Sequence, residues 1–281
     1  MPVNALSVDV EDWFQVYALE RAVDRRDWDS LEHRVVGNTH TILDLFDTAG
    51  VKGTFFTLGW VAERYPALMR TIVARGHELA SHGCDHRRVY TMEPEQFRAD
   101  VIRSKQLLED ASGVAVTGYR APSFSFDTRT PWAHRILAES GYLYSSSVAP
   151  LAHDHYGWPD APRSLFRPLA DSSFVELPVT IAQICGRSFV TGGGYFRLLP
   201  GRITDNAIRR TNRTDARPAI FYFHPWEIDP GQPRVPNTPL RSRFRHYTRL
   251  GAMEGKVARL LERHAWDRVD AIIAREAERL Q

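Results

Sequence analysis

The chain has 281 residues, of which 43% are hydrophobic, and this suits one large domain whose core needs no disulfides. Its 36 basic and 34 acidic residues leave a net charge of only +2, which gives no reason to expect a nucleic-acid partner. No stretch approaches the roughly 20 apolar residues that cross a bilayer, so stable membrane insertion is not expected.

Strand and helix patterns alternate along the first half of the chain. The sequence predicts strands at 5–12, 53–58, 78–81 and 118–120, and helices at 40–49, 66–75, 93–112 and 131–140. In the first strand, apolar residues at 6, 8 and 10 alternate with polar residues at 7, 9 and 11. Pro66 suits the first turn of its helix, and Gly76 suits the helix end.

The second half continues this alternation with longer connections. Strands are predicted at 175–178 and 219–223, with a short helix at 205–211 between them. One long helix is predicted over 252–280, and the Pro- and Arg-rich stretch 234–249 is interpreted as a surface excursion. Strands that alternate with helices indicate an α/β fold with a mainly parallel sheet.

Four chemically reactive residues stand at the C-terminal ends of predicted strands: Asp9, His82, Arg120 and His224. In barrels of parallel strands, working residues collect at these ends. The coincidence of four such residues therefore predicts a functional site at this edge of the sheet.

A metal site is indicated by a histidine pair and an acidic run. His82 and His86 can face one metal if the segment between them makes about one helical turn. Asp9 and Glu11 share a strand face, which favours Glu11 as the third ligand and Asp9 as a base. Asp12 is the alternative ligand, or otherwise a turn or helix N-cap residue. Imidazole and carboxylate ligands favour Zn²⁺, although cobalt or iron is compatible.

The motifs resemble those of the NodB-type polysaccharide deacetylases, carbohydrate esterase family 4, from Leu6 to about Arg263. The matching motifs are Asp9 with Glu11, His82 with His86, Arg120-Ala121-Pro122 and Tyr222-Phe223-His224. The runs 192–197 and 223–227 resemble a narrower branch, associated with exopolysaccharide loci of exosortase-bearing bacteria.

This resemblance implies a distorted, incomplete (β/α) barrel. It implies a single catalytic domain over 1–281, with a branch-specific C-terminal extension from about 230. The implied activity is metal-dependent removal of N-acetyl groups from a glycan or exopolysaccharide precursor. Asp9 would act as base, Arg120 would pair with Asp9, and His224 would protonate the departing amine. The alternatives are a deformylase or O-deacetylase acting on a lipid- or nucleotide-linked sugar, and a catalytically weakened glycan-binding protein.

The fourth motif of this chain departs from the family pattern. The family commonly has an aspartate where this chain has Ser145, and that aspartate normally helps to set the basicity of the acid histidine. A serine can donate and accept hydrogen bonds but adds no charge. Ser145 is therefore the feature that favours the weakened binding protein.

The sequence gives only indirect signals of the cellular compartment and the oligomeric state. The N-terminus shows no basic segment followed by a long apolar stretch, so no secretory signal is visible. Cys84 and Cys185 are interpreted as free thiols in a reducing compartment. Together these features indicate a cytoplasmic protein, and the sequence leaves its oligomeric state open.

Overall fold

A computed structural model of the protein describes residues 2–153, 156–184 and 186–277, so Cys185 lies outside the described residues. Within them, eight parallel strands form one sheet in the order β10-β1-β2-β3-β4-β5-β6, and β9 also pairs with β1. The sheet strands are β1 (Asn4–Val10), β2 (Thr54–Thr57), β3 (Glu78–Ser81), β4 (Gly118–Tyr119), β5 (Tyr144–Ser145), β6 (Val175–Glu176), β9 (Ile220–Phe223) and β10 (Trp266–Asp267). An antiparallel hairpin, β7 (Ile181–Ile184) with β8 (Arg187–Val190), stands apart from this sheet.

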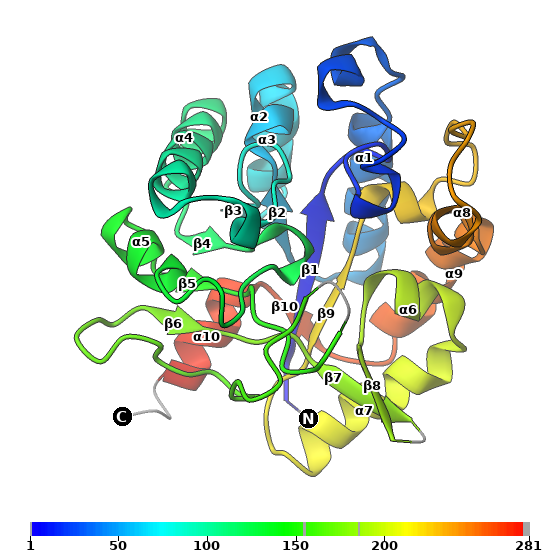
Figure 1. Ribbon diagram of the computed structural model, residues 1–281. Helices are drawn as coiled ribbons and strands as arrows, with labels where there is room; N and C mark the ends of the chain where they lie inside the picture. Colours follow the sequence, from blue (N-terminus) through cyan, green and yellow to red (C-terminus); the bar gives the residue numbers. More distant parts are fainter. Residues whose placement is uncertain (1, 154–155, 185, 278–281) are drawn as a thin grey trace.

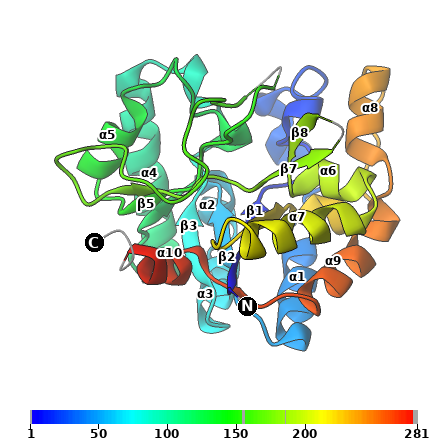
Figure 2. The same ribbon diagram turned by 90° about the horizontal axis from the view of Figure 1, so that it is seen from below.

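Helices surround the sheet (Figures 1 and 2). The α-helices are α1 (Val35–Ala49), α2 (Gly59–Arg64), α3 (Pro66–Ala74), α4 (Pro94–Ser112), α5 (Ala133–Glu139), α6 (Gly193–Leu198), α7 (Gly201–Arg213), α8 (Leu240–Tyr247), α9 (Met253–Leu261) and α10 (Val269–Ala277). Short 3-10 helices cover Tyr17–Leu19, Arg25–Ser30, Val89–Thr91, Pro122–Phe124, Pro225–Ile228 and Leu250–Ala252. The curled sheet and its ring of helices confirm the expected α/β fold, a distorted and incomplete barrel.

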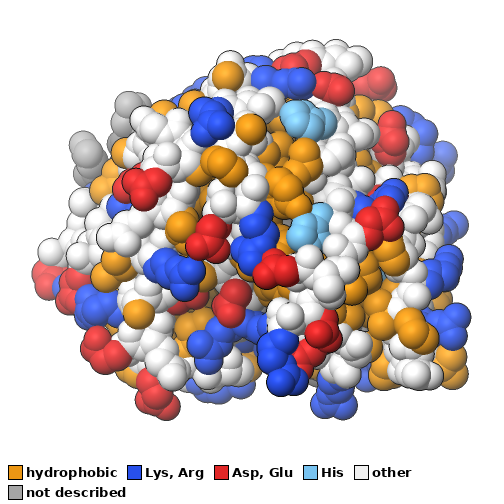
Figure 3. Space-filling model, turned by 90° about the horizontal axis from the view of Figure 1, so that it is seen from above, with side chains coloured by type: hydrophobic (Ala, Val, Ile, Leu, Met, Phe, Trp, Pro, Cys, Tyr) orange, Lys and Arg blue, Asp and Glu red, His pale blue; other side chains and the backbone are white. Residues whose placement is uncertain are grey.

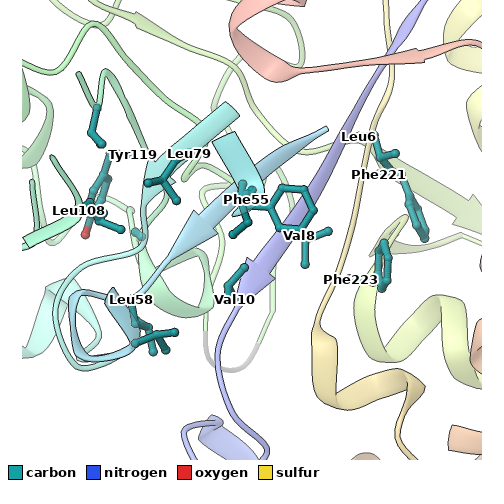
Figure 4. Close-up of a cluster of buried hydrophobic side chains, with 14 of the residues drawn as sticks. Leu6, Val8, Val10, Phe55, Leu58, Leu79, Leu108, Tyr119, Phe221 and Phe223 are labelled. Carbon is teal, nitrogen blue, oxygen red and sulfur yellow. The ribbon is translucent and has the colours of Figure 1, made fainter. Parts of the chain in front are cut away.

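The sheet is buried on both faces, which is typical of parallel strands covered by helices. On one face, alternate residues of β1, including Leu6 and Val8, pack with Phe55 and Phe221 against the helices (Figure 4). On the other face, a second cluster contains Phe56 and other residues that point into the half-barrel. Every residue of β1 is buried, so the strand that carries Asp9 lies at the centre of the fold.

One prediction for the C-terminal third is wrong. The stretch 252–280 does not form one helix, because α9 ends at Leu261 and β10 follows before α10 begins. Trp266 pairs with Asn4 at the start of β1, a long-range contact that overrides the helical pattern. The stretch 234–249, interpreted as a surface excursion, is mostly exposed or half-buried and contains the helix α8 at Leu240–Tyr247.

A buried glutamate beneath the sheet gives the fold a specific pH dependence. Burial, with a further contribution from the charge of Asp270, raises the pKa of Glu78 from 4.5 to about 8. Thr54 and Tyr144 donate hydrogen bonds to its carboxyl oxygens. The folded protein therefore keeps a proton that the unfolded chain releases above pH 4.5. Stability should fall as the pH rises from about 4.5 to about 8, with no further loss from this group above that.

Glu78→Gln should flatten this decline, because the amide cannot ionise, although only its oxygen can still accept a hydrogen bond. Thermal unfolding midpoints measured between pH 5 and pH 9 check this expectation. A decline as steep in Glu78→Gln as in the wild type would show that other groups cause it.

Candidate active site

The strand register brings four strand ends to one edge of the sheet. Strands β1 and β9 pair as far as Val8 and Phe223, and the next residues are Asp9 and His224. Strands β3 and β4 pair at Ser81 and Tyr119, and the next residues are His82 and Arg120. Because β2 joins β1 to β3 in parallel register, all four side chains stand at the same C-terminal edge.

Three side chains at this edge have the arrangement of a metal site. Glu11, His82 and His86 each offer a ligand atom, and these atoms lie within 4.8 Å of one another. The segment between the histidines is a loop and not the helical turn considered from the sequence. Gly83 and His86 both have positive φ, 76° and 58°, and this loop brings the two imidazole centroids to 5.4 Å.

Each imidazole is suited to metal binding. His82 Nδ1 lies 2.8 Å from the Arg120 carbonyl oxygen, so a proton on Nδ1 leaves Nε2 free as a ligand. Burial lowers the pKa of His82 to about 4, which keeps this imidazole neutral at physiological pH. His86 Nε2 lies 2.8 Å from Glu11 Oε2.

The surroundings of the Glu11 carboxylate decide whether a divalent cation fits between it and the two histidines. Its Oε1 accepts a hydrogen bond of 3.0 Å from Trp226 Nε1, whereas the buried Oε2 has the imidazole of His86 as its neighbour, with Nε2 at 2.8 Å. Burial alone would raise the pKa of Glu11, but the charge and hydrogen bond of His86, with a further contribution from the charge of His224, lower it to about 2. An ionised, buried carboxylate oxygen that lies beside two imidazoles fits a divalent cation.

The Asp12 carboxylate contacts backbone groups and not the two histidines. Its carboxylate accepts hydrogen bonds from the backbone N–H groups of Trp13, Arg34 and Val35, at 2.8, 2.8 and 3.0 Å. Two of these groups begin α1, so Asp12 fixes the start of that helix. Asp12 does not join the Glu11, His82 and His86 group.

Asp9 stands next to this group and is paired with a buried cation. Arg120 is fully buried, and its Nη1 donates 2.7 Å hydrogen bonds to Asp9 Oδ1 and to Ser7 Oγ. Its Nε and Nη2 donate to the carbonyl and hydroxyl oxygens of Ser146. The guanidinium also lies 4.1 Å from the ring centroid of Phe56. This set of contacts fixes one side of the Asp9 carboxylate and leaves Oδ2 toward His224, at 3.9 Å from Nε2.

His224 is held by a carboxylate from its own segment. Its Nδ1 lies 2.9 Å from Glu227 Oε2, and Arg197 donates to the other oxygen of Glu227 at 3.1 Å. Burial opposes the charge on His224, but the hydrogen bond and charge of Glu227 raise the pKa of His224 to about 9. Ser145, the departure at the fourth motif, instead donates to Ser147. The negative charge nearest to His224 is therefore that of Glu227, and the carboxylates of Asp9 and Glu11 lie 3.9 and 3.8 Å from its Nε2.

A cavity of about 500 Å³ opens over these groups. Asp9, Glu11, His82, His86 and His224 all line it. Its walls are largely aromatic and apolar, and include Tyr17, Phe124, Tyr156, Tyr195, Leu198, Tyr222, Trp226 and Phe244. Figure 3 looks onto this face, where hydrophobic side chains gather between two patches of histidine. The site is thus open to a ligand with both polar and apolar surface.

Sequence reasoning missed several supporting residues. Trp226 and Glu227 follow His224 directly, and their spacing to it was the available signal. Ser146 and Arg197 gave no signal, because their partners lie far away in the chain. Gly192 lies close against β9, because a Cβ there would meet the Tyr222 carbonyl oxygen at 2.2 Å.

Residues 28–144 match the family model described as polysaccharide deacetylase. The chain contains a polysaccharide deacetylase domain. Residues 146–274 match a second model, described as a domain of unknown function, DUF3473. The boundary between the two matches falls at the end of β5, beside Ser146, which contacts Arg120.

Curated relatives of this deacetylase domain cover part of the chain. A peptidoglycan deacetylase of Helicobacter pylori is 32% identical over 107 residues, which are 38% of this chain and 36% of the relative. A chitooligosaccharide deacetylase of Bradyrhizobium is 29% identical over 133 residues, 47% of this chain and 55% of the relative. The chain thus spans between about a third and about half of the length of these relatives.

Two solved structures resemble the fold of this chain over nearly its whole length. A Mycobacterium smegmatis protein, solved as a candidate polysaccharide deacetylase, has a TM-score of 0.64 at 21% identity, covering 99% of this chain and 91% of its own. A carbohydrate esterase family 4 pseudoenzyme of Bacillus anthracis has a TM-score of 0.51 at 14% identity, covering 96% and 65%. These likenesses show the fold, and because one belongs to a pseudoenzyme, activity must be argued from the side chains.

Proposed function

We propose that this protein is a metal-dependent hydrolase that removes N-acetyl groups from a glycan or exopolysaccharide precursor. The observation that carries the proposal is a Glu11, His82 and His86 donor group beside a separate carboxylate, Asp9, that is paired with a buried arginine. Relatives named as peptidoglycan and chitooligosaccharide deacetylases support the choice of an N-acetylated glycan as substrate.

Glu11, His82 and His86 would hold the metal, which we propose to be Zn²⁺ because two imidazoles and one carboxylate are a common catalytic zinc set. We assign the acidic ligand to Glu11 because both oxygens of Asp12 are taken by backbone N–H groups. A zinc ion bound there supplies Lewis acidity, which polarises an amide carbonyl and makes water easier to deprotonate.

Asp9 would accept the proton from the attacking water. Arg120 keeps the Asp9 carboxylate in one orientation, because the buried guanidinium donates directly to Oδ1. The free side of the carboxylate, Oδ2, is the one that lies toward the cavity and His224.

His224 would donate a proton to the departing amine, which is a poor leaving group until protonated. The raised pKa of about 9 keeps His224 protonated before that step. Glu227 supplies the charge that the family commonly draws from its fourth motif, so Ser145 no longer favours a weakened binding protein. We propose that residues 1–281 act as one catalytic unit, in which the segment from about 230 contributes Arg241 and Phe244 to the cavity wall.

The test is acetate release from N-acetylglucosamine oligomers by the purified full chain, with bound metal quantified in parallel. We expect close to one metal per chain and acetate release that a chelator abolishes and added Zn²⁺ restores. Formate release from N-formyl sugars, with no acetate release, would favour the deformylase. Bound metal with no release from a broad panel of acetylated glycans would favour a glycan-binding protein.

A further inference from the structure

Helix α8 exposes an unusual pair of hydrophobic side chains beside the cavity. Leu240 is 82% exposed and Phe244 is 60% exposed, and Leu240 is the most exposed large hydrophobic residue in the described part of the chain. The two are four residues apart, so they share one face of the helix. Folded proteins seldom place two such side chains together on a surface without a partner for them.

The segment around this helix is strongly basic. Residues 230–253 contain no aspartate or glutamate and carry five arginines: Arg234, Arg241, Arg243, Arg245 and Arg249. Five positive charges in 24 residues contrast with a net charge of +2 for the whole chain. Except for Arg245, which is half-buried, these arginines are exposed. The segment therefore combines exposed apolar groups with a local excess of positive charge.

The opposite face of α8 is fixed to the candidate site. His246 is fully buried, stacks on Trp226 at a centroid distance of 4.4 Å, and lies 2.6 Å from Gln232. Trp226 in turn donates to Glu11. Because this side is anchored, Leu240 and Phe244 are held on the exposed side of the helix, and α8 itself lies at the level of the C-terminal strand ends (Figure 1). Phe244 also lines the cavity, so the exposed pair is continuous with the cavity wall.

We propose that α8 and the arginines around it form a docking surface for an anionic lipid bilayer. Exposed Leu and Phe side chains flanked by arginines are the composition of helices that lie in the membrane interface. The apolar side chains would enter the headgroup region while the arginines contact lipid phosphates. Docked in this way, the protein would turn the mouth of its cavity toward the membrane surface.

Two other partners for the α8 surface fit the observations less well. An acidic polysaccharide would satisfy the arginines but gives no role to Leu240, which gains only from an apolar environment. A second copy of this chain would bring its own basic segment against this one, and like charges in contact oppose association. A bilayer with anionic headgroups satisfies both the charge and the apolar pair.

The test uses the full chain and vesicles of phosphatidylcholine, with or without about a third of phosphatidylglycerol, in a sedimentation assay. Leu240→Gln/Arg243→Gln changes the docking surface at two residues that do not line the cavity. Leu143→Gln/Arg213→Gln is the matched control, since Leu143 is 60% exposed and both residues lie outside the α8 segment. Each single variant is measured as well, and circular dichroism checks that all of them fold.

We expect binding to anionic vesicles that weakens with salt, and little binding to phosphatidylcholine alone. The α8 double variant should bind about tenfold less tightly, whereas the control should match the wild type. No binding to anionic vesicles, or equal binding by both double variants, would overturn the proposal. So would dimerisation that depends on Leu240, or binding to an acidic polysaccharide alone. None of these readouts depends on deacetylase activity.

Discussion

Asp9→Asn should lower kcat by about 10²–10⁴-fold and leave the metal content unchanged, because a positioned general base contributes about that much. The amide has nearly the same shape as the carboxylate but cannot accept a proton at neutral pH. Asp9 is not one of the three grouped donors, so its substitution leaves the Glu11, His82 and His86 set intact. The measurement is kcat for acetate release together with metal per chain.

Stability must be followed in the same variant. Arg120 is fully buried and loses its charged partner in Asp9→Asn, which makes the folded state less stable. The rate is therefore measured well below the unfolding temperature and per mole of folded protein. Wild-type kcat in a folded, metal-loaded Asp9→Asn protein would remove Asp9 from its proposed role as base.

His82→Ala should lose both the metal and the activity, because it removes one of three ligands. We expect metal per chain to fall from close to one to near zero after dialysis, and acetate release to fall below detection. Added Zn²⁺ at high concentration should restore only part of the rate. Metal analysis by mass spectrometry and a zinc titration of the rate measure these effects.

The matched control is Asp12→Asn. Its carboxylate is buried at the same strand end but accepts backbone N–H groups at the start of α1. This variant should keep its metal and lose about 1 kcal/mol of stability, since one of the accepted hydrogen bonds is removed. Loss of metal in Asp12→Asn with retention in Glu11→Gln would reverse the assignment of the acidic ligand.

The sequence could predict where the reactive residues stand but only part of how they meet. Period-two alternation places Asp9 and Glu11 on one strand face, and parallel strands bring His82 and His224 to the same edge. The approach of His86 depends on a loop with two positive φ angles, which residue spacing alone does not encode.

Long-range contacts explain what the sequence could not predict. The helical pattern of 252–280 corresponds to two helices, α9 and α10. The pairing of Trp266 with Asn4 separates them. Glu227 stands three residues after His224, so a local signal for its role existed. Arg197, which holds the other oxygen of Glu227, comes from α6 and could be found only in the folded chain.

The boundary between the two family matches runs through the middle of this chemistry. Arg120 lies in the first matched segment, whereas Ser146, which it contacts, and His224 lie in the second. Asp9 precedes both segments and faces His224 across the cavity floor. Replacing residues 146–274 with those of a distant relative would exchange the proposed acid, and replacing residues 28–144 would exchange the arginine that orients the proposed base. The two halves are therefore expected to have been inherited together, with compensating changes on both sides of the boundary.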